Sequence, residues 1–471
     1  KGNCTIMSSQ GQVVSMPGYV SGVRGSATPT SHALWTSNPQ NFRNNGYLTL
    51  SSGKIFHTEE GGIGNIDPIL NGPGMPPNED PPSWSYGLSM QNVNAVANMF
   101  PTTKSEDEFG VPASLQGIFD ASSGDPSQAN QLADRVISQD AIAKLRLAAW
   151  NRNKTGQPFF LGAGFRKPHL PFRFPTPWLQ SILPENETAV AAHPTLDSSV
   201  PSVAHGDHPP QATPFVAVAN ATAQHWRCHY YAAIAWVDSQ IGRVLDELEN
   251  LGQKQNTLVV LHADHGWSLG EHGEWQKFSN FEHGTRVPLI MRAPWISGAV
   301  GRSSVLAELI DVFPTMAELA GVTLPAGEKL DGKSLAPVIR GVGNTALAED
   351  LKPFAMSQYM RCPENDSAAW SDNNCLFTER VLFKIMGYTL RTSKYRFTEW
   401  TKWNSTSLTP DHTPSGLIGV ELYTHRSVGL AYDFNEFENK NEAESNPAMV
   451  MKLRALLHAA IHNETRVPSL P

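Results

Sequence analysis

The chain has 471 residues, which is enough for a large hydrophobic core and, at the usual size of domains, for more than one domain. Charged residues make up 17% of the chain and the formal net charge is −8, with no basic stripe, so nucleic acid is not an expected partner. No apolar run reaches the roughly 18 residues that cross a bilayer, so no membrane span is expected. The sequence gives no indication of the oligomeric state.

Cysteines and glycosylation motifs indicate the compartment. Cys362 and Cys375 flank a short polar loop, where they either form a local disulfide or remain two free thiols. Residues 1–12 are polar and do not have the pattern of a signal peptide. Seven Asn-x-Ser/Thr motifs favour passage through the secretory pathway, to a lysosomal or extracellular destination. They lie at Asn3, Asn153, Asn186, Asn220, Asn365, Asn404 and Asn463.

Elements of regular structure alternate along the first three quarters of the chain. Residues 1–30 are rich in Gly and Ser and predict no apolar strand. Apolar runs predict strands at 47–50, 158–161, 257–261 and 288–291. Helical spacing predicts a helix over 126–151 with Asp125 as its N-cap and a helix over 229–250. The apolar face of the second helix is expected to carry Ile234, Val237, Ile241, Val244 and Leu248, and a further helix ends at Gly321.

This alternation predicts an α/β fold with a mostly parallel central sheet flanked by helices. Segments near 388–398 and 421–423 alternate instead, which is typical of antiparallel strands. We therefore expect two units: an α/β domain over 1–350 and a smaller C-terminal α+β subdomain over 351–471, closed by a helix near 448–462.

The strand at 257–261 is followed by a group of polar residues. It is mostly β-branched and apolar, as for a strand buried on both faces, and it leads into Asp264 and His265. Ligands bind at the carboxyl ends of strands in open α/β sheets. Lys277 follows a dozen residues later, and such a carboxylate, imidazole and ammonium could together hold a divalent cation and an anionic substrate. The alternative is an ordinary solvated loop.

Two more segments place polar residues after predicted strands. Lys54 and His57 follow the strand at 47–50, within GKIFH, and His169 follows the strand at 158–161, within RKPHLPF. Taken singly, each has an ordinary reading as a turn lysine or a loop histidine. His205, Asp207 and His208 form a further dense cluster, which we interpret as loop surface.

Together these segments resemble the sulfatases of the alkaline phosphatase superfamily, and among them the iduronate-2-sulfatase subgroup. The resemblance implies that Asp264 and His265 ligate Ca²⁺. It also implies that the catalytic residues Lys54, His57, His169 and Lys277 contact the sulfate ester. Preorganised positive charge and a divalent cation would stabilise the charge that develops on the sulfuryl and leaving oxygens. The expected substrates are sulfate monoesters of sulfated glycans.

Two parts of the family pattern are not recognisable in the 471 residues: paired aspartates that complete the cation site, and Cys-x-Pro-Ser-Arg, whose cysteine becomes the formylglycine nucleophile. We therefore expect an incomplete cation site and impaired hydrolysis. The chain is then a truncated or mis-started copy of an active enzyme, a non-catalytic binder of sulfated glycans, or an enzyme with a different nucleophile. Phosphodiesterases and phosphatases of the same superfamily remain a rival class.

Overall fold

The computed structural model describes residues 36–55, 83–85, 132–170, 172, 174–206, 215–297, 301–328, 330–341, 351–362, 375, 382–425 and 438–461, and the backbone of 5–7 and 13–15. His57, Asp125, Asp207 and His208 lie outside this range. In residues 1–30, where no strand is expected, β1 (Thr5–Met7) pairs antiparallel with β2 (Val13–Ser15), so that prediction is wrong. Each strand has three residues, which are too few to show in the sequence the apolar and polar alternation typical of a strand.

The α/β part begins with two parallel strands. β3 (Leu48–Gly53) pairs in parallel with β4 (Phe159–Gly164), from Leu48 opposite Phe159 to Gly53 opposite Gly164. The connection between them includes α5 (Ala133–Thr155), as parallel neighbours require. Leu48 and Leu50 are buried and pack with Ala148 of α5. The helix therefore covers one face of this strand pair.

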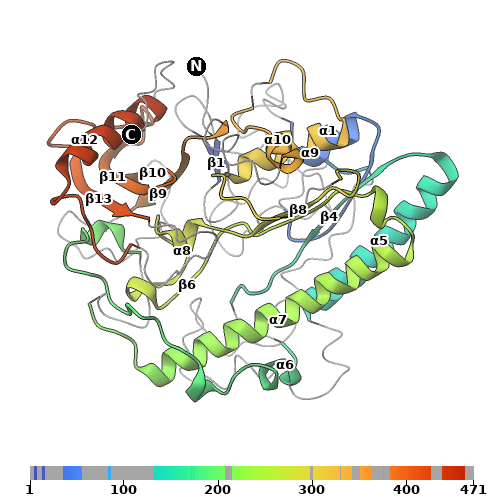
Figure 1. The fold of residues 1–471 in the computed structure, drawn as a ribbon, viewed down its shortest axis with the longest axis horizontal. Helices are drawn as coiled ribbons and strands as arrows, with labels where there is room; N and C mark the ends of the chain where they lie inside the picture. The colour runs from blue at the N-terminus through green and yellow to red at the C-terminus, as the bar shows by residue number, and fades with distance from the viewer. Residues whose placement is uncertain are drawn as a thin grey trace.

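Two long helices lie side by side along one flank of the molecule (Figure 1). α7 (Asn220–Asn250) is linked to α5 by Ser138 Oγ, 3.1 Å from Gln240 Oε1, and by Arg146, whose Nε lies 2.7 Å from Glu247 Oε1. Shorter helices among the described residues before the C-terminal part are α1 (Asn38–Asn44), α6 (Thr176–Gln180), α8 (Glu282–Thr285), α9 (Val312–Ala320) and α10 (Ala336–Arg340).

Both long helices depart from their predicted bounds. α5 begins at Ala133, after an extended Leu132, rather than at residue 126. α7 begins nine residues before the predicted start, because its first turns bury aromatic and polar side chains that form no aliphatic stripe. Ile234, predicted on the buried face, is 40% exposed, whereas Ala233 and Trp236 are buried. Val237 and Leu248, also predicted there, are buried, so small and aromatic residues share the packed face with some of the predicted aliphatic ones.

The strand that leads to Asp264 has an unexpected neighbour. β5 (Val259–His262) pairs antiparallel with β8 (Leu289–Arg292), although a parallel pairing is expected from the repeated strand and helix pattern. The segment between them contains only short elements, β6 (Ser268–Leu269), β7 (Trp275–Gln276) and α8, so the chain returns without a long crossover helix. β8 is also less buried than predicted, with Ile290 61% exposed.

The C-terminal part is an antiparallel sheet with a helix packed on it, as predicted (Figure 1). Its strands are β9 (Ala355–Arg361), β10 (Ile385–Arg391), β11 (Tyr395–Asn404), β12 (Thr409–Pro410) and β13 (Leu417–Thr424), and its helix is α12 (Pro447–Ile461). Leu453, Leu456 and Leu457 of α12 pack with Leu390 and Phe397 in the largest buried apolar cluster of the described residues. The predicted domain boundary at 350 falls outside the described residues and stays a prediction.

Buried polar contacts join the two parts. The Arg391 Nε atom lies 2.6 Å from Glu282 Oε1. Glu438, which pairs with Arg396 within the C-terminal part, accepts the backbone N–H of Glu282. Arg361, fully buried, donates to the carbonyls of Val203, Phe278 and Ala204. The segment that carries Lys277 is therefore anchored to the C-terminal sheet.

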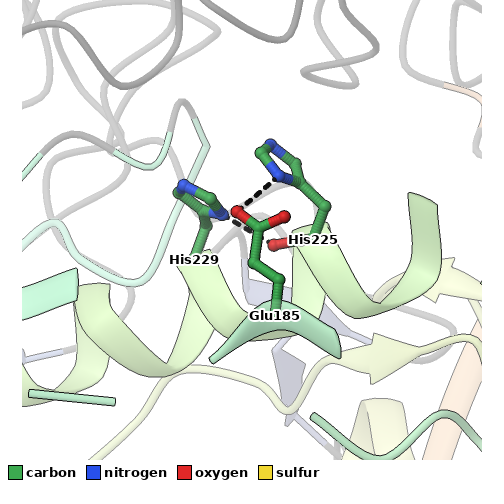
Figure 2. A group of neighbouring side chains, drawn as sticks. All are labelled: Glu185, His225 and His229. Carbon is green, nitrogen blue, oxygen red and sulfur yellow. Dashed lines mark hydrogen bonds and ion pairs between the residues drawn. The ribbon is translucent and has the colours of Figure 1, made fainter. Parts of the chain in front are cut away.

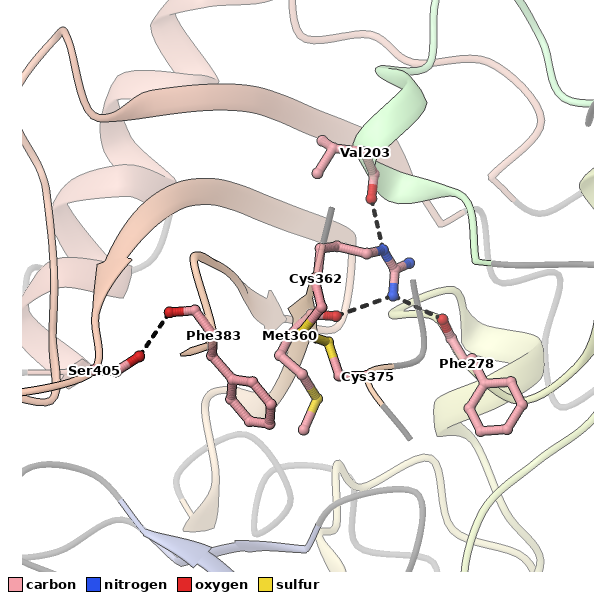
Figure 3. Close-up of a disulfide and its surroundings, with 8 residues drawn as sticks. Val203, Phe278, Met360, Cys362, Cys375, Phe383 and Ser405 are labelled. Carbon is pink, nitrogen blue, oxygen red and sulfur yellow. Dashed lines mark hydrogen bonds between the residues drawn. A yellow bond between two sulfur atoms is a disulfide. The ribbon is translucent and has the colours of Figure 1, made fainter. Parts of the chain in front are cut away.

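Cys362 and Cys375 form a disulfide, which settles the two alternatives left by the sequence (Figure 3). It follows β9 directly, and in the same region Ser405 Oγ donates to the carbonyl of Phe383 at 2.6 Å. Cys228, on α7, is a buried free thiol. Among the helices of the described ranges, none is long and apolar enough to cross a bilayer.

Candidate active site

The end of β5 presents the two predicted cation ligands. Asp264 and His265 follow the strand after one residue, and His265 Nε2 lies 3.6 Å from Asp264 Oδ2. The same carboxylate oxygen is 3.3 Å from Lys54 Nζ, although 210 residues separate the two in sequence. The structure thus brings the first predicted segment to the tip of β5.

Two glycines determine where Lys54 lies. Gly53 has φ of +75°, and a Cβ atom there would lie 2.1 Å from the carbonyl oxygen of Gly164, at the end of β4. A Cβ on Gly164 would lie 1.8 Å from the carbonyl oxygen of Lys54. Only glycine allows the two strand ends to approach this closely, which permits the hydrogen bond from Lys54 N to Gly164 O at 2.7 Å. Lys54 therefore leaves β3 beside the start of the loop that carries His169.

A buried aspartate shapes the His169 loop. Asp134, in the first turn of α5, accepts the backbone N–H of Arg166 at 2.6 Å and that of Lys167 at 3.3 Å. Lys167 Nζ in turn donates to the carbonyl of His169 at 2.7 Å. These bonds fix the backbone of the loop, so the position of His169 does not depend on its own side chain.

The two site imidazoles are oriented in the same way. His169 Nδ1 lies 2.6 Å from the carbonyl oxygen of Leu170, and His265 Nδ1 lies 2.8 Å from that of Gly266. A carbonyl only accepts, so Nδ1 carries the proton in each neutral ring and Nε2 keeps its lone pair. His265 Nε2 is buried and has no hydrogen-bond partner among the described side chains and backbone. Such an atom is available to ligate a cation.

Lys277 approaches from the segment after β7. It is only 6% exposed, and its Nζ lies 5.7 Å from the ring centre of Phe278. Gln276 has φ of +92°, which turns the chain sharply before the lysine. Because Arg361 holds the carbonyl of Phe278, the C-terminal sheet helps to position Lys277.

The pKa values show that these groups share one electrostatic environment. Burial opposes ionisation of Asp264, but His265, Lys54 and Lys277 outweigh it and lower the pKa of Asp264 to about 2. Burial, followed by the charge of Lys277, lowers the pKa of His265 to about 4. Burial also lowers the pKa of His169 well below its usual value, and Lys277 and Arg166 add to this effect. At neutral pH the site thus contains an aspartate anion and neutral imidazoles.

The structure therefore brings Lys54, Asp264 and His265 together at the tip of β5. His169 joins them through Trp267, whose ring lies beside both histidines, and Lys277 through its effect on the pKa values of Asp264, His265 and His169. His57 lies outside the described residues, and the roles of all six stay predictions.

Sequence reasoning missed two neighbours of the site. Arg166 adds a positive charge that lowers the pKa of His169. Trp267 places its ring centre 6.3 Å from that of His169 and 6.4 Å from that of His265. Each lies within three residues of a predicted site histidine, and this closeness in sequence is the signal that could have identified it.

Other polar residues of the region have structural partners. Glu271 pairs with Arg227 at 3.0 Å, and Glu274 accepts from Ser279 at 2.6 Å and from the Gly206 N–H at 3.0 Å. His205 is buried rather than on the surface, so that interpretation is wrong. The N–H of Gly206, next in the chain, is held by buried Glu274, which draws this turn inward.

The residues present fit a divalent cation in part. Asp264 supplies a carboxylate oxygen, and His265 supplies a buried nitrogen without a hydrogen-bond partner. At neutral pH Asp264 is ionised and His265 is neutral, which are the forms that ligate metals. Ca²⁺ takes six to eight oxygen ligands, so the remaining ones would come from water, substrate or residues outside the described ranges.

Comparisons with known proteins identify the family. The sequence profile of the Sulfatase family matches residues 83–322, just over half of the chain, and the profile "N-sulphoglucosamine sulphohydrolase, C-terminal" matches residues 270–401. Iduronate 2-sulfatase from Homo sapiens is 29% identical over 421 residues, which cover 78% of this chain and 70% of that protein. Arylsulfatase K from Xenopus laevis is 30% identical over 262 residues, covering 50% and 47%.

Solved structures confirm the fold. A phosphonate monoester hydrolase from Silicibacter pomeroyi superposes with a TM-score of 0.61 at 20% identity, covering 92% of this chain and 81% of that chain. A structure described as a 2-O GAG sulfatase gives a TM-score of 0.53 at 19% identity and covers 95% of this chain and 81% of that chain. The α/β class with its C-terminal antiparallel unit is thereby confirmed. The chain belongs to the sulfatase family, whose members are sulfuric ester hydrolases.

Proposed function

We propose that the cluster at the tip of β5 binds sulfate monoesters of sulfated glycans together with one divalent cation, Ca²⁺. One observation carries this proposal: Asp264 Oδ2 lies 3.3 Å from Lys54 Nζ and 3.6 Å from His265 Nε2. The effect of Lys277 on the pKa values of Asp264, His265 and His169 supports it. Two ammonium groups and a cation around one position suit a sulfuryl group, whose oxygens gain charge as the ester bond breaks. Similarity to iduronate 2-sulfatase favours a sulfated uronate as the sugar.

The residues divide into three roles under this proposal. Asp264 and His265 ligate the cation, and Lys54 and Lys277 contact the sulfate oxygens. His169, neutral and with its lone pair on Nε2, lies near the leaving oxygen and handles its proton, a role that it would share with His57. A bound Ca²⁺ would supply charge neutralisation for the sulfate group.

Catalysis also requires a nucleophile. We propose that this polypeptide hydrolyses sulfate esters poorly, because Cys-x-Pro-Ser-Arg is not found in its 471 residues. The two parts of the proposal separate experimentally. The purified chain is incubated with Ca²⁺ and either an aryl sulfate or a sulfated uronate disaccharide, and both turnover and binding are measured. Calcium-dependent binding without robust turnover is expected, whereas robust metal-dependent turnover would overturn the second part.

Substitutions test whether the two lysines hold the ligand. Lys54→Ala and Lys277→Ala are each expected to weaken binding of the disaccharide about tenfold or more, since each removes a charge-assisted hydrogen bond in a partly buried site. Lys440→Ala, at a lysine outside the cluster, serves as the matched control. Unchanged affinity in both site variants would remove the basis of the proposal.

Metal analysis distinguishes the rival class. The phosphodiesterases and phosphatases of the superfamily use zinc, with further Asp and His ligands. One calcium at the Asp264 site supports a sulfatase, whereas two zinc ions lost together on Asp264→Asn would favour the rival.

We also propose a lysosomal or extracellular location, which the seven glycosylation motifs support and which treatment of the secreted protein with an N-glycosidase would test.

A further inference from the structure

A second group of metal-binding side chains lies in the C-terminal sheet. Oε1 of Glu399, on β11, contacts His412 Nδ1 at 3.2 Å and His458 Nε2 at 2.9 Å. His412 lies just after β12 and His458 lies on α12. One nitrogen of each ring and one carboxylate oxygen all lie within 4.8 Å of one another. Three separate elements therefore bring three ligand atoms to one point.

These atoms have the composition and spacing of a zinc site. Zinc binds imidazole nitrogen and carboxylate oxygen at about 2.0–2.2 Å in tetrahedral geometry, which sets neighbouring ligand atoms about 3.3 Å apart. The contacts of 2.9 and 3.2 Å are close to that spacing. The two ring centres, now 3.8 Å apart, would separate slightly on binding. Since both histidines retain some exposure, 21% and 28% of their side chains, the rings have space to do so.

The carboxylate is prepared for this role. Its Oε2 accepts from Arg454 Nε at 2.6 Å, so the arginine orients the group and leaves Oε1 to face the two histidines. Such a supporting bond orients ligands at metal sites.

A comparable group, formed by two histidines of α7 and by Glu185, is drawn in Figure 2 and is less suited to a metal ion. His225 and His229 lie one turn apart, and Glu185 Oε1 is 2.9 Å from His225 Nδ1. However, His229 Nδ1 already donates to the carbonyl of His225 at 2.7 Å, and the Glu185 side chain is 46% exposed. Binding there would cost a backbone hydrogen bond or require the other nitrogen, and would also immobilise an exposed side chain.

The third group, Glu282, His425 and Glu438, is fully buried and already neutralised. Arg391 pairs with Glu282 and Arg396 with Glu438, each at 2.6 Å. Adding a cation would place it beside two guanidinium groups in a dry interior, which is costly. This group is therefore a structural ion network.

We propose that Glu399, His412 and His458 form a zinc site that fastens α12 and the turn after β12 to the C-terminal sheet. A water molecule would complete a tetrahedral set of ligands. The site secures the helix that contributes Leu453, Leu456 and Leu457 to the core under the sheet. It is separate from the cation site at Asp264 and independent of the proposed sulfate chemistry.

The test uses the full chain carrying Asp264→Asn, so that the first cation site does not interfere. After chelation and buffer exchange, Co²⁺ is titrated and its visible d–d absorption recorded, followed by displacement with Zn²⁺. His412→Gln and His458→Gln keep an amide donor toward Glu399 but remove a good metal ligand. His225→Gln, in the group on α7, is the matched control.

We expect one Co²⁺ bound with a tetrahedral-type spectrum and displaced by Zn²⁺. Each of His412→Gln and His458→Gln should weaken binding at least about tenfold and abolish the zinc-induced rise in melting temperature. His225→Gln should leave both unchanged. The proposal is overturned if no Co²⁺ binds, if both site variants retain it, or if His225→Gln abolishes it instead.

Discussion

Glu274 should make the protein less stable as the pH rises. Its side chain is 2% exposed and is held by Ser279 and the Gly206 N–H. Burial raises its pKa to about 7 from a usual value of 4.5, despite these two hydrogen bonds. Between about pH 4.5 and 7, Glu274 therefore keeps its proton in the folded protein and has lost it in the unfolded chain. Stability from this group is present below pH 4.5 and is lost as the pH rises through 7.

The size of the effect follows from the shift. The rise in the pKa of Glu274 from 4.5 to about 7 corresponds to about 3 kcal/mol in the free energy of unfolding, at roughly 1.4 kcal/mol per pKa unit. A chain of 471 residues has an unfolding entropy of about 1 kcal/mol/K, so the melting temperature should fall by about 3 °C from this group. Glu274→Gln keeps an acceptor for Gly206 and removes the titration.

The assay compares melting temperatures at pH 4.5 and 7.5 by differential scanning calorimetry. Between these pH values wild type should lose about 3 °C more than Glu274→Gln, because other titrating groups are common to both proteins. Glu444→Gln, at an exposed glutamate, should behave as wild type. Equal pH dependence in wild type and Glu274→Gln would refute the reasoning.

Three further predictions follow from particular contacts. Gly164→Ala should leave the protein folded but weaken binding of the sulfated ligand at least about tenfold, as measured by calorimetry. The new Cβ would lie 1.8 Å from the carbonyl oxygen of Lys54 and would displace that lysine. Unaltered binding would contradict this. Replacing both Cys362 and Cys375 with Ser should cost about 3 kcal/mol in urea unfolding, as expected for a loop with a sequence separation of 13 residues, and no loss would show that the crosslink is dispensable. Arg361→Met should cost about 3 kcal/mol or more by leaving three buried carbonyls without their donor, with a wild-type unfolding midpoint as the opposing result.

Much of the site could be predicted because its signals are local. An apolar run followed by Asp264 and His265 marks a strand end, and the same reasoning applies to Lys54 and His169. That these ends converge depends on parallel pairing of β3 with β4, which the alternation of strands and helices predicts correctly. The role of glycine at 53 and 164 follows only from the 2.1 and 1.8 Å approaches in the structure.

The remainder depends on contacts between distant residues. Pairing of Arg361 with the carbonyl of Val203 spans 158 positions, and no spacing rule encodes it. The antiparallel register of β8 with β5 follows from the path of the loop between them, whose turns are set by His272 at φ of 56° and Gln276 at φ of 92°. Such left-handed residues are uncommon outside glycine, so a sequence pattern does not reveal them.

The site at Asp264 is tested most directly by calorimetric titration of a sulfated uronate disaccharide into the full chain, with Ca²⁺ and with a chelator, in wild type and Asp264→Asn. The substitution keeps the shape of the side chain but removes the charge that faces Lys54 and His265. Wild type should bind at least about tenfold more tightly with Ca²⁺ than with the chelator, and Asp264→Asn should lose this difference. Equal affinity under all four conditions would contradict a shared cation and sulfate site.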